Sequence, residues 1–518
     1  MAETQAQMTT TKVALTWGEE QVLSRKTVLD DIIGSDDGCT YIIKHTRKGK
    51  APLIIEKYGN DMSLKKSVPI MLGEKEEKRV YQHATQIDGA LILFSSVLDN
   101  KSKVNSLYAQ TINKETLYPS SKLTKIGAIE FDGKSKRNSG SFTYTISNDE
   151  KRILIYYNLP YEKDENEKFF YHIFDKDLNL LWEKNVTLPY ENDLFVVVDY
   201  DIQENGDLYL LSKIFKEKAK ERRKGKPNYH YQILAYTDKG ESKKEYPVVL
   251  EGKFLTDMKI AINQEGDIIC GGFYSDNGTM SINGSYFLKI DESTKSIVSK
   301  SFKEFGIDFI TQNMTDKNKK KTKKREEKGK DVELYQYDLD DIVLKDDGGA
   351  VLVGEQYYVR VVTTTDTQGN IRTTYHYYYN DIIVISIDPD GQIEWTEKIA
   401  KRQHTINDGG FFSSYALAIF EDKMNFIFND NAKNLATSKM TKGKAKGVIY
   451  DFTKRFKSSV AVLVQLDSDG RQVKEALFNA KDAELLIRPK VAEQISDQEM
   501  VIYGQKRKTE RFGKITFK

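Results

Sequence analysis

The histidines and cysteines are the side chains whose chemistry can be judged most directly from their spacing. No two histidines form the His-x-x-x-His pair that a metal site on one helix needs. The six are His45, His83, His172, His230, His376 and His404. Two cysteines among 518 residues exclude a disulfide framework and a multi-cysteine zinc site. The sequence also lacks a Gly-x-Ser-x-Gly elbow, a P-loop and a dinucleotide fingerprint, so we expect no catalytic residue, no metal and no cofactor.

Six aspartates stand in three close pairs at or beside apolar runs. They are Asp30 and Asp31, Asp199 and Asp201, and Asp340 and Asp341. Paired carboxylates can act as general acid and base, and an enzyme that uses them would act on a polysaccharide or a peptide. The same acids also suit the solvated ends of strands. We therefore favour a protein that is not an enzyme and keep an envelope enzyme as the alternative.

Two Asp-x-Asp-Gly segments are similar to the start of a calcium loop. Asp388-x-Asp390-Gly391 and Asp467-x-Asp469-Gly470 lack the later acidic ligand that a site of six or seven oxygens requires. Asp and Gly also favour the positive φ angles and local hydrogen bonds of tight turns. We expect both segments to be hairpin turns.

A recurring turn segment reveals the elements that must position these residues. Each of eight copies contains Asp, Gly, Asn or Glu and precedes an alternating or wholly apolar run, at a spacing of about 66 residues. The copies begin at Ser35, Gln86, Ser147, Gln203, Asn263, Lys345, Phe420 and Ser496. A second Asp-rich turn falls in most intervals, so each repeat holds two hairpins and therefore four strands.

Eight four-stranded repeats rich in Val, Ile, Tyr and Phe predict an all-β chain folded as an eight-bladed β-propeller. No long stretch has helical spacing, and no apolar run approaches the roughly 20 residues that span a bilayer. The last repeat lacks one strand, and residues 11–19 supply a lone strand at the other end of the sequence. We expect this strand to join the last blade and close the ring.

The repeat predicts one propeller domain over residues 11–518. It follows residues 1–10, which we expect to be disordered or a signal-peptide remnant. The approximate blades are 26–72, 78–130, 140–190, 193–251, 254–305, 334–402, 411–479, and 485–518 joined with 11–19. The three tryptophans, Trp17, Trp182 and Trp395, all fall in the fourth strand of a repeat.

Two of these tryptophans carry a resemblance to a known family. Asp175 to Trp182 and Asp388 to Trp395 each place Trp seven residues after an Asp in a turn. This pattern resembles degenerate copies of the tryptophan-docking repeat of eight-bladed quinoprotein-like propellers, although the Thr-Gly step of that repeat is absent. The resemblance implies the fold and its closure without quinone chemistry, and the group includes envelope propellers that scaffold outer-membrane assembly. More loosely, the chain resembles exported propellers of Lys- and Tyr-rich bacterial proteomes, such as the plug subunit of the type IX secretion translocon.

Four basic insertions interrupt the repeat, where a propeller connects strand two to strand three or one blade to the next. They are residues 215–228, 313–331, 359–379 and 430–457. They contain 26 Lys and Arg against 9 Asp and Glu, a net charge of +17 in a chain of net charge +2, so the remainder carries −15. We predict one basic, loop-rich face that attracts acidic partners. Segment 313–331 by itself is typical of a solvated, mobile linker.

We expect a protein partner to dock on this face, with tyrosines as anchors and lysines raising the association rate. The candidate residues are Lys216, Lys218, Arg222, Arg223, Tyr375, Tyr377, Tyr378, Tyr379, Lys442, Lys444 and Lys446. The insertions lack the usual nucleic-acid modules, so we expect no specific nucleic acid.

These features favour a non-catalytic protein-binding scaffold, or an accessory subunit of a bacterial envelope complex for outer-membrane assembly or secretion. The partner would be an outer-membrane translocon or assembly complex. Residues 1–7, Met-Ala-Glu-Thr-Gln-Ala-Gln, are similar to the small and polar residues before a signal-peptidase cut. With the resemblance, they favour a periplasmic or exported protein, and a cytoplasmic location stays open.

Overall fold

The computed structural model describes most of the 518 residues. The described ranges are 10–23, 27–36, 38–46, 53–72, 79–131, 139–160, 165–217, 222–223, 226–263, 265–276, 281–330, 332–438 and 449–518. They form two compact units. We call residues 24–251 the N-terminal unit, and residues 252–518 together with residues 1–23 the C-terminal unit.

The N-terminal unit contains four antiparallel sheets, each built from four strands in sequence order. Blade 1 consists of β3 (Thr27–Asp36), β4 (Cys39–Thr46), β5 (Leu53–Tyr58) and β6 (Leu64–Ile70), and blade 2 of β7 (Arg79–Ile87), β8 (Ala90–Asp99), β9 (Val104–Ile112) and β10 (Thr124–Glu130). Blade 3 consists of β11 (Thr143–Ile146), β12 (Ile153–Asn158), β13 (Asn166–Phe174) and β14 (Leu180–Glu191), and blade 4 of β15 (Phe195–Ile202), β16 (Leu208–Phe215), β19 (Tyr229–Thr237) and β20 (Ser242–Val248).

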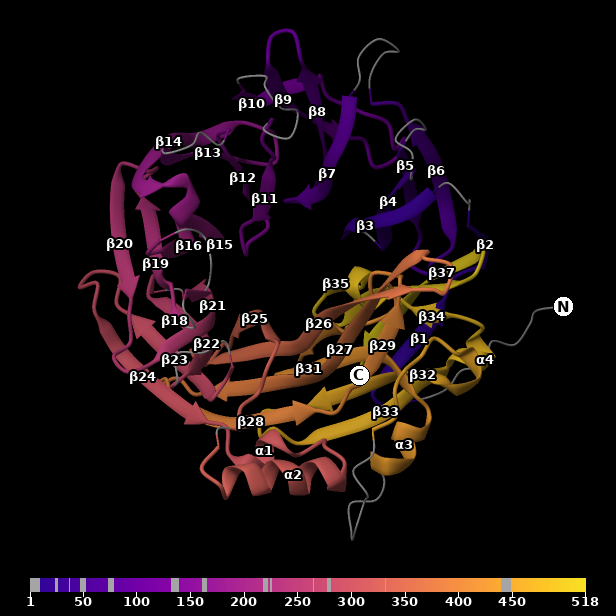
Figure 1. The fold of residues 1–518 in the computed structure, drawn as a ribbon. Coiled ribbons are helices and arrows are strands. Elements are labelled where there is room, and N and C mark those ends of the chain that lie inside the picture. Colours follow the sequence, from indigo (N-terminus) through magenta and orange to yellow (C-terminus); the bar gives the residue numbers. More distant parts are fainter. Residues whose placement is uncertain are drawn as a thin grey trace, which may run out of the picture. The chain divides into compact units, whose positions relative to one another are not determined.

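The C-terminal unit contains the other four blades (Figure 1). Blade 5 consists of β21 (Phe254–Ile262), β22 (Ile268–Ser275), β23 (Gly284–Ile290) and β24 (Ile297–Glu304), and blade 6 of β25 (Tyr337–Leu344), β26 (Ala350–Thr365), β27 (Ile371–Ile387) and β28 (Ile393–Ile399), with β29 (Gln403–Ile406) added to β27. Blade 7 consists of β30 (Ala416–Phe420), β31 (Lys423–Asn431), β32 (Ser459–Leu466) and β33 (Gln472–Asn479).

The last blade is completed by the N-terminal strand, as the sequence predicts. Blade 8 contains β34 (Leu486–Ile487) and β35 (Glu493–Ser496), which both pair with β36 (Glu499–Lys506), followed by β37 (Thr509–Phe517). β1 (Val13–Trp17) pairs antiparallel with β37, and β2 (Gln21–Val22) adds a short extension. Eight blades of four strands make the chain an eight-bladed β-propeller, which confirms the predicted fold class.

The hydrophobic core lies between neighbouring blades. Within the C-terminal unit, one cluster joins blades 5 and 6 through Phe273, Leu352 and Ile385, and another joins blades 6 and 7 through Val353 and Phe426. A central strand is therefore covered on both faces, and every residue of β22 is buried. This explains why the strand repeats are wholly apolar in places instead of alternating.

Two of the three tryptophans contact hairpin turns of the following blade. The Trp182 indole N–H donates to the Gly206 carbonyl at 3.2 Å, and the Trp395 indole N–H donates to the Ser468 carbonyl at 2.7 Å. Gly470, at φ +79°, lies against the Trp395 ring so closely that an added Cβ would come within 3.0 Å of it. This turn therefore needs glycine both for its positive φ and for the ring contact.

The insertion 313–331 contains a helix, which corrects the linker expected from its composition. α1 (Ile307–Ile310) and α2 (Asp316–Glu326) lie beside β28 in Figure 1. The Thr315 side chain caps α2 by accepting the backbone N–H of Asn318, and Lys and Glu are good helix formers. The short helices elsewhere are α3 (Lys433–Ser438), α4 (Ala480–Ala483), η2 (Asn192–Leu194), η3 (Phe456–Ser458) and η4 (Pro489–Val491).

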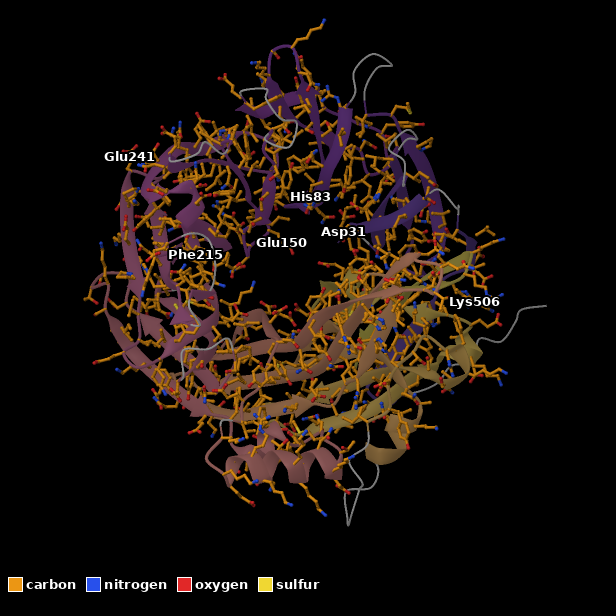
Figure 2. All side chains as sticks on the ribbon, in the orientation of Figure 1. Asp31, His83, Glu150, Phe215, Glu241 and Lys506 are labelled. Carbon is orange, nitrogen blue, oxygen red and sulfur yellow. The ribbon has the colours of Figure 1, made fainter. Side chains whose placement is uncertain are left out.

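In blade 4, the long insertion and the tight turn between β19 and β20 lie at opposite ends of the blade. In Figure 2, Phe215 marks the end of β16, where the insertion 215–228 begins, and Glu241 marks the turn between β19 and β20 at the opposite end. The described part of this insertion adds the paired two-residue strands β17 (Arg222–Arg223) and β18 (Lys226–Pro227). In the C-terminal unit, insertion 313–331 comes after β24, insertion 359–379 extends β26 and β27, and insertion 430–457 begins at the end of β31. All three lie at the end of the blade where strand two passes to strand three.

Candidate functional site

The insertion 359–379 is a β-hairpin, which corrects the loop expected from the sequence. β26 and β27 are 16 and 17 residues long, and their pairing continues to the hairpin tip. Runs of Thr, Val and Tyr favour extended backbone. At the tip, the Asp366 carboxylate accepts the backbone N–H groups of Gln368 and Asn370, each at 2.9 Å, and so closes the turn. We call residues 357–379 the arm.

One face of the arm is a row of exposed or half-buried apolar and aromatic side chains. Val359 lies opposite Tyr377 and Val361 lies opposite Tyr375, so these four side chains share a face. Val361 is 55% exposed, Tyr375 is 46% exposed, and Ile371 near the tip is 72% exposed. Exposed apolar and aromatic side chains grouped on one face make this surface a candidate contact site.

The opposite face of the arm carries a stack of four aromatic rings from three strands. Tyr358 of β26 stacks on Tyr378 of β27, and Tyr378 stacks on His404 of β29, with 4.5 Å between ring centroids in both pairs. His404 stacks in turn on His376, and a hydrogen bond of 2.9 Å joins the two imidazoles. Burial, followed by the nearby His376, lowers the pKa of His404. The stack ties the arm to β29 and thereby limits its bending.

Tyr379 is buried at the base of the arm, which corrects the expectation that it lies on a partner surface. It is 5% exposed, and the Lys490 ammonium donates to its hydroxyl at 2.6 Å. The same ammonium lies 4.1 Å from the centre of the ring, and its removal from water lowers the pKa of Lys490. Gly410 packs against the ring and the hydroxyl of Tyr379, where no Cβ would fit. Tyr379 therefore anchors the arm.

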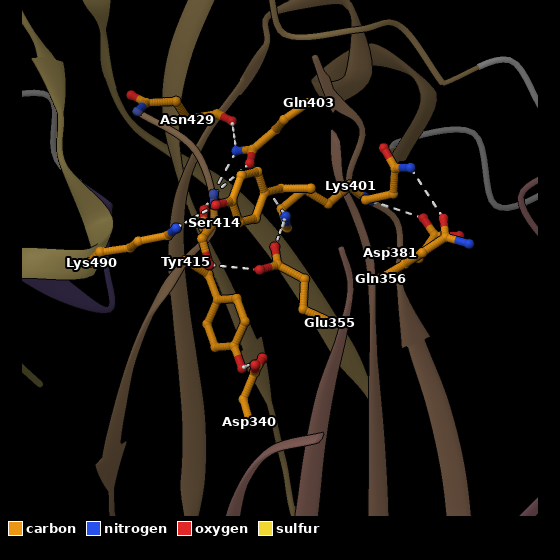
Figure 3. A network of polar contacts seen from close by, with 12 residues as sticks. Asp340, Glu355, Gln356, Asp381, Lys401, Gln403, Ser414, Tyr415, Asn429 and Lys490 are labelled. Carbon is orange, nitrogen blue, oxygen red and sulfur yellow. Dashed lines mark hydrogen bonds and ion pairs between the residues drawn. The ribbon is translucent and has the colours of Figure 1, made fainter. Parts of the chain in front are cut away.

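A buried polar network lies at the base of the arm (Figure 3). Lys401 and Glu355 form an ion pair, and both side chains are buried. The Ser414 hydroxyl donates to the second Glu355 oxygen at 2.7 Å. The Gln403 amide accepts the backbone N–H of Ser414 at 2.7 Å and donates to the Asn429 carbonyl at 2.8 Å. These hydrogen bonds connect blade 6 to blade 7 and compensate the desolvation of the two charges.

Asp340 belongs to a pair that links adjacent blades. The Tyr415 hydroxyl donates a hydrogen bond of 2.6 Å to the Asp340 carboxylate (Figure 3). The Asp340 side chain reaches solvent, but protein surrounds its carboxyl group on several sides. This partial removal from water raises the pKa of Asp340 to about 7. In the N-terminal unit, Tyr81 donates to Asp30 at 2.7 Å in the same relation between consecutive blades. The repetition indicates a structural role for the Asp–Tyr pair.

The other paired aspartates serve the backbone. Asp31, Asp199 and Asp341 each follow a β-bulge in the first strand of a blade. Each carboxylate accepts the backbone N–H of the next residue, at 2.9, 3.1 and 2.8 Å. Asp257 does the same in blade 5, and Asp201 accepts a side-chain amide at 2.6 Å. In Figure 2, Asp31 is labelled on β3 of blade 1. The predicted carboxylate pairs therefore stabilise bulges and strand ends.

The described residues contain no group of three His, Cys, Asp or Glu side chains that could hold a metal ion. Two histidines from different strands, His376 and His404, do meet. Asp388 and Asp467 accept backbone N–H groups of their own turns at 2.7 and 2.8 Å, which confirms that these segments are hairpin turns. Among the helices of the described ranges, none is long and apolar enough to cross a membrane.

Most of the basic candidate residues fall where the structure gives no description. Lys218, Lys442, Lys444 and Lys446 lie outside the described residues. Lys216 is exposed at the end of blade 4. Arg222 and Arg223 form β17, and their side chains are not described. The role of all seven in binding a partner stays a prediction.

Sequence reasoning named the tyrosines of the arm but missed the side chains that surround them. Val359 and Val361 lie opposite Tyr377 and Tyr375, and the run of Tyr, Val and Thr before Asp366, which are residue types that favour strands, was the signal that could have shown a strand. The Glu355–Lys401 network has no such signal, because its members come from four separate segments.

Comparison with known proteins concerns the fold. No protein-family model and no curated protein matches the sequence. The WD40 domain of SCAP from fission yeast is similar at 8% identity over 96% of this chain and 98% of that chain, with a TM-score of 0.39. A quinohemoprotein alcohol dehydrogenase from Pseudomonas putida shows 11% identity over 96% and 76%, with a TM-score of 0.42. The β-propeller domain of the Trilobed protease from Pyrococcus furiosus shows 11% identity over 73% and 98%, with a TM-score of 0.33.

Proposed function

We propose that this propeller is a non-catalytic scaffold that binds a protein partner through the arm. The exposed Val359, Val361 and Tyr375, with the half-buried Tyr377 on the same face, carry the proposal. Tyrosine supplies a large contact area with few rotatable bonds, and a paired strand is already ordered before binding. The buried base of the arm holds this row in place, so little entropy is lost when a partner covers it.

We further propose that the partner belongs to a bacterial envelope complex for outer-membrane assembly or secretion, and that the protein acts in the periplasm or outside the cell. This part of the proposal is supported by the family resemblance of the Trp182 and Trp395 segments and by residues 1–7, which lie outside the described residues. An outer-membrane translocon or assembly complex is the partner to seek first.

The test is affinity capture from envelope fractions followed by surface plasmon resonance with the purified partner. Tyr375→Ala combined with Val361→Thr should raise the dissociation rate about 30-fold, because an anchor contact is worth roughly 2 kcal/mol. Tyr118→Ala is the matched control, since Tyr118 is 53% exposed and belongs to the N-terminal unit, whereas the arm belongs to the C-terminal unit. Equal dissociation rates for the arm variant and the wild type would refute docking through the arm.

The basic insertions should act on the association rate. Neutralising Lys216, Lys218, Arg222 and Arg223 should slow association and flatten its salt dependence without changing the dissociation rate, because exposed charges steer encounter and are screened within about 10 Å at 0.1 M salt. If the dissociation rate changes instead, these side chains are contacts and the division between anchors and steering charges is wrong.

An enzyme is the second candidate, and Asp340 is the observation that favours it. A solvent-accessible carboxyl with a pKa raised to about 7 is suited to donate a proton near neutral pH. Of the two carboxylates whose charges act on Asp340, Glu355 is paired with Lys401, and Asp338 is the one to test as a second catalytic acid. Turnover of a polysaccharide or peptide by the wild type that Asp340→Asn abolishes would support this function over the scaffold.

A further inference from the structure

Helix α2 carries a row of lysines along one side. Lys317, Lys320, Lys321 and Lys324 follow the spacing i, i+3, i+4 and i+7, which places them on one face, and Lys328 continues the row after the helix. All five are exposed. We call these five residues the lysine stripe. At 1.5 Å per residue, its helical part is about 10 Å long.

The opposite side of α2 attaches the helix to the unit. Lys319, Thr322 and Lys323 are half-buried, and Lys323 forms an ion pair with Asp308 of α1 at 2.8 Å. Thr322 contacts Met314, which packs against the core between blades 5 and 6. The lysine stripe therefore faces solvent because the other side of the helix is fixed.

The lysine stripe has no carboxylate partner among the described residues. None of its five ammonium groups forms an ion pair there, although other exposed lysines of the chain do, such as Lys65 with Asp61 at 3.5 Å. A concavity of about 450 Å³ is lined by all five and by Arg325 and Lys330. Like charges at i and i+4 repel each other along a helix, and an anion placed in this concavity relieves that repulsion.

The lysine stripe is connected to the arm through blade 6. Lys398 of β28 donates to the Phe309 carbonyl of α1 at 2.9 Å and lies over the Phe309 ring at 4.5 Å. The charge of Lys398 also acts on Asp381, which lies on β27 where the arm begins. Helices α1 and α2 are thus fixed to the same blade that carries the arm.

The composition of the lysine stripe selects its ligand. It has no apolar side chain that could enter a bilayer and no aromatic side chain on which a base could stack. Arg325 is the single arginine that lines the concavity, so six of its seven cations lack the planar fork that binds phosphate in two-point contacts. Lysine ammonium groups act as single point charges, and helices α1 and α2 are attached to the blade that carries the arm.

We infer that the lysine stripe binds an acidic segment of the protein partner that docks on the arm. This inference rests on the proposed scaffold function, and it assigns to the partner a run of Asp or Glu next to its apolar contact. An extended segment of three or four residues covers the helical part of the stripe, at about 3.3 Å per residue.

The test measures binding of a fluorescent peptide of six glutamates separated by glycines to the full-length chain at 50 mM salt. Lys320→Gln, Lys321→Gln and Lys324→Gln together should weaken the Kd at least tenfold. The matched control, Lys122→Gln, Lys125→Gln and Lys151→Gln, removes the same charge from exposed residues of the N-terminal unit and should change the Kd less than twofold. Circular dichroism checks that all variants keep the fold.

Four outcomes separate the alternatives. Equal peptide affinity for the stripe variant and the control overturns the inference. Tighter stripe-dependent binding of vesicles with phosphatidylserine, or of a 20-nucleotide oligothymidylate, also overturns it and assigns the stripe to lipid or nucleic acid. A captured partner that needs the arm but is indifferent to the stripe variant refutes this inference alone. Stripe-dependent peptide binding with a captured partner that is indifferent to the arm variant supports the acidic ligand and refutes the arm.

Discussion

Replacing Lys401 by Met should destabilise the C-terminal unit more than any exposed substitution. The side chains of Lys401 and Glu355 are 0% and 4% exposed, so the variant leaves a buried carboxylate without its counter-ion. Breaking a buried ion pair from one side typically costs about 3–5 kcal/mol. At roughly 2 °C per kcal/mol for a unit of this size, the melting temperature should fall by about 6–10 °C.

Scanning calorimetry measures this fall in melting temperature. Two further variants test whether it comes from the unpaired buried charge. Lys423→Met removes an exposed partner of Glu421 and should cost less than about 1 kcal/mol. The double variant Lys401→Met with Glu355→Leu should recover much of the loss, because no unpaired charge remains. A melting temperature within 2 °C of the wild type for Lys401→Met would refute the role of the network. Hydrogen exchange in the arm should also increase, since the network supports its base.

Three further predictions concern the propeller itself. Deleting residues 1–19 removes β1 from the edge of β37 and should lower the melting temperature by several degrees, which corresponds to roughly 1 kcal/mol or more. An unchanged melting temperature would argue against closure by this strand. Asp340→Asn should raise the melting temperature relative to the wild type, by an amount that grows from pH 4 to pH 7 and then stays constant. The reason is that the wild-type Asp340 pKa is raised from 3.8 to about 7 in the folded state, which costs stability as pH rises through that window. A difference in melting temperature that is independent of pH would contradict the raised pKa. Trp395→Phe loses the hydrogen bond to Ser468 and should cost about 1 kcal/mol in calorimetry, whereas no loss would show that ring packing alone matters.

The blades could be predicted from sequence because their signals are local. A turn such as Asp88–Gly89 needs positive φ at both positions, which the structure shows. The apolar run after such a turn is the second strand of a blade. The closing strand followed from a count of strands at the two ends. Each of these predictions depended only on residues close together in the sequence. Because the pattern occurs eight times, a weak copy could be recognised from the others.

The arm and the lysine-rich helix were harder to predict because charge and polarity hid their structure. The composition of 313–331 is that of a solvated linker, and its helix depends on the cap at Thr315 and on the contact between Lys323 and Asp308. Tyr379 has the same local sequence context as Tyr377. Its burial depends on Lys490, more than one hundred residues away, which no local pattern reports.

The most direct test of docking through the arm is site-specific photo-crosslinking in cells. A photoreactive phenylalanine analogue at position 375 should give one dominant adduct with a protein of the envelope. The same analogue at position 118, which is 53% exposed against 46% for position 375, should give none. An adduct at 118 and none at 375, or no protein adduct at either position, would contradict the account that this propeller is a scaffold that binds its partner through the arm.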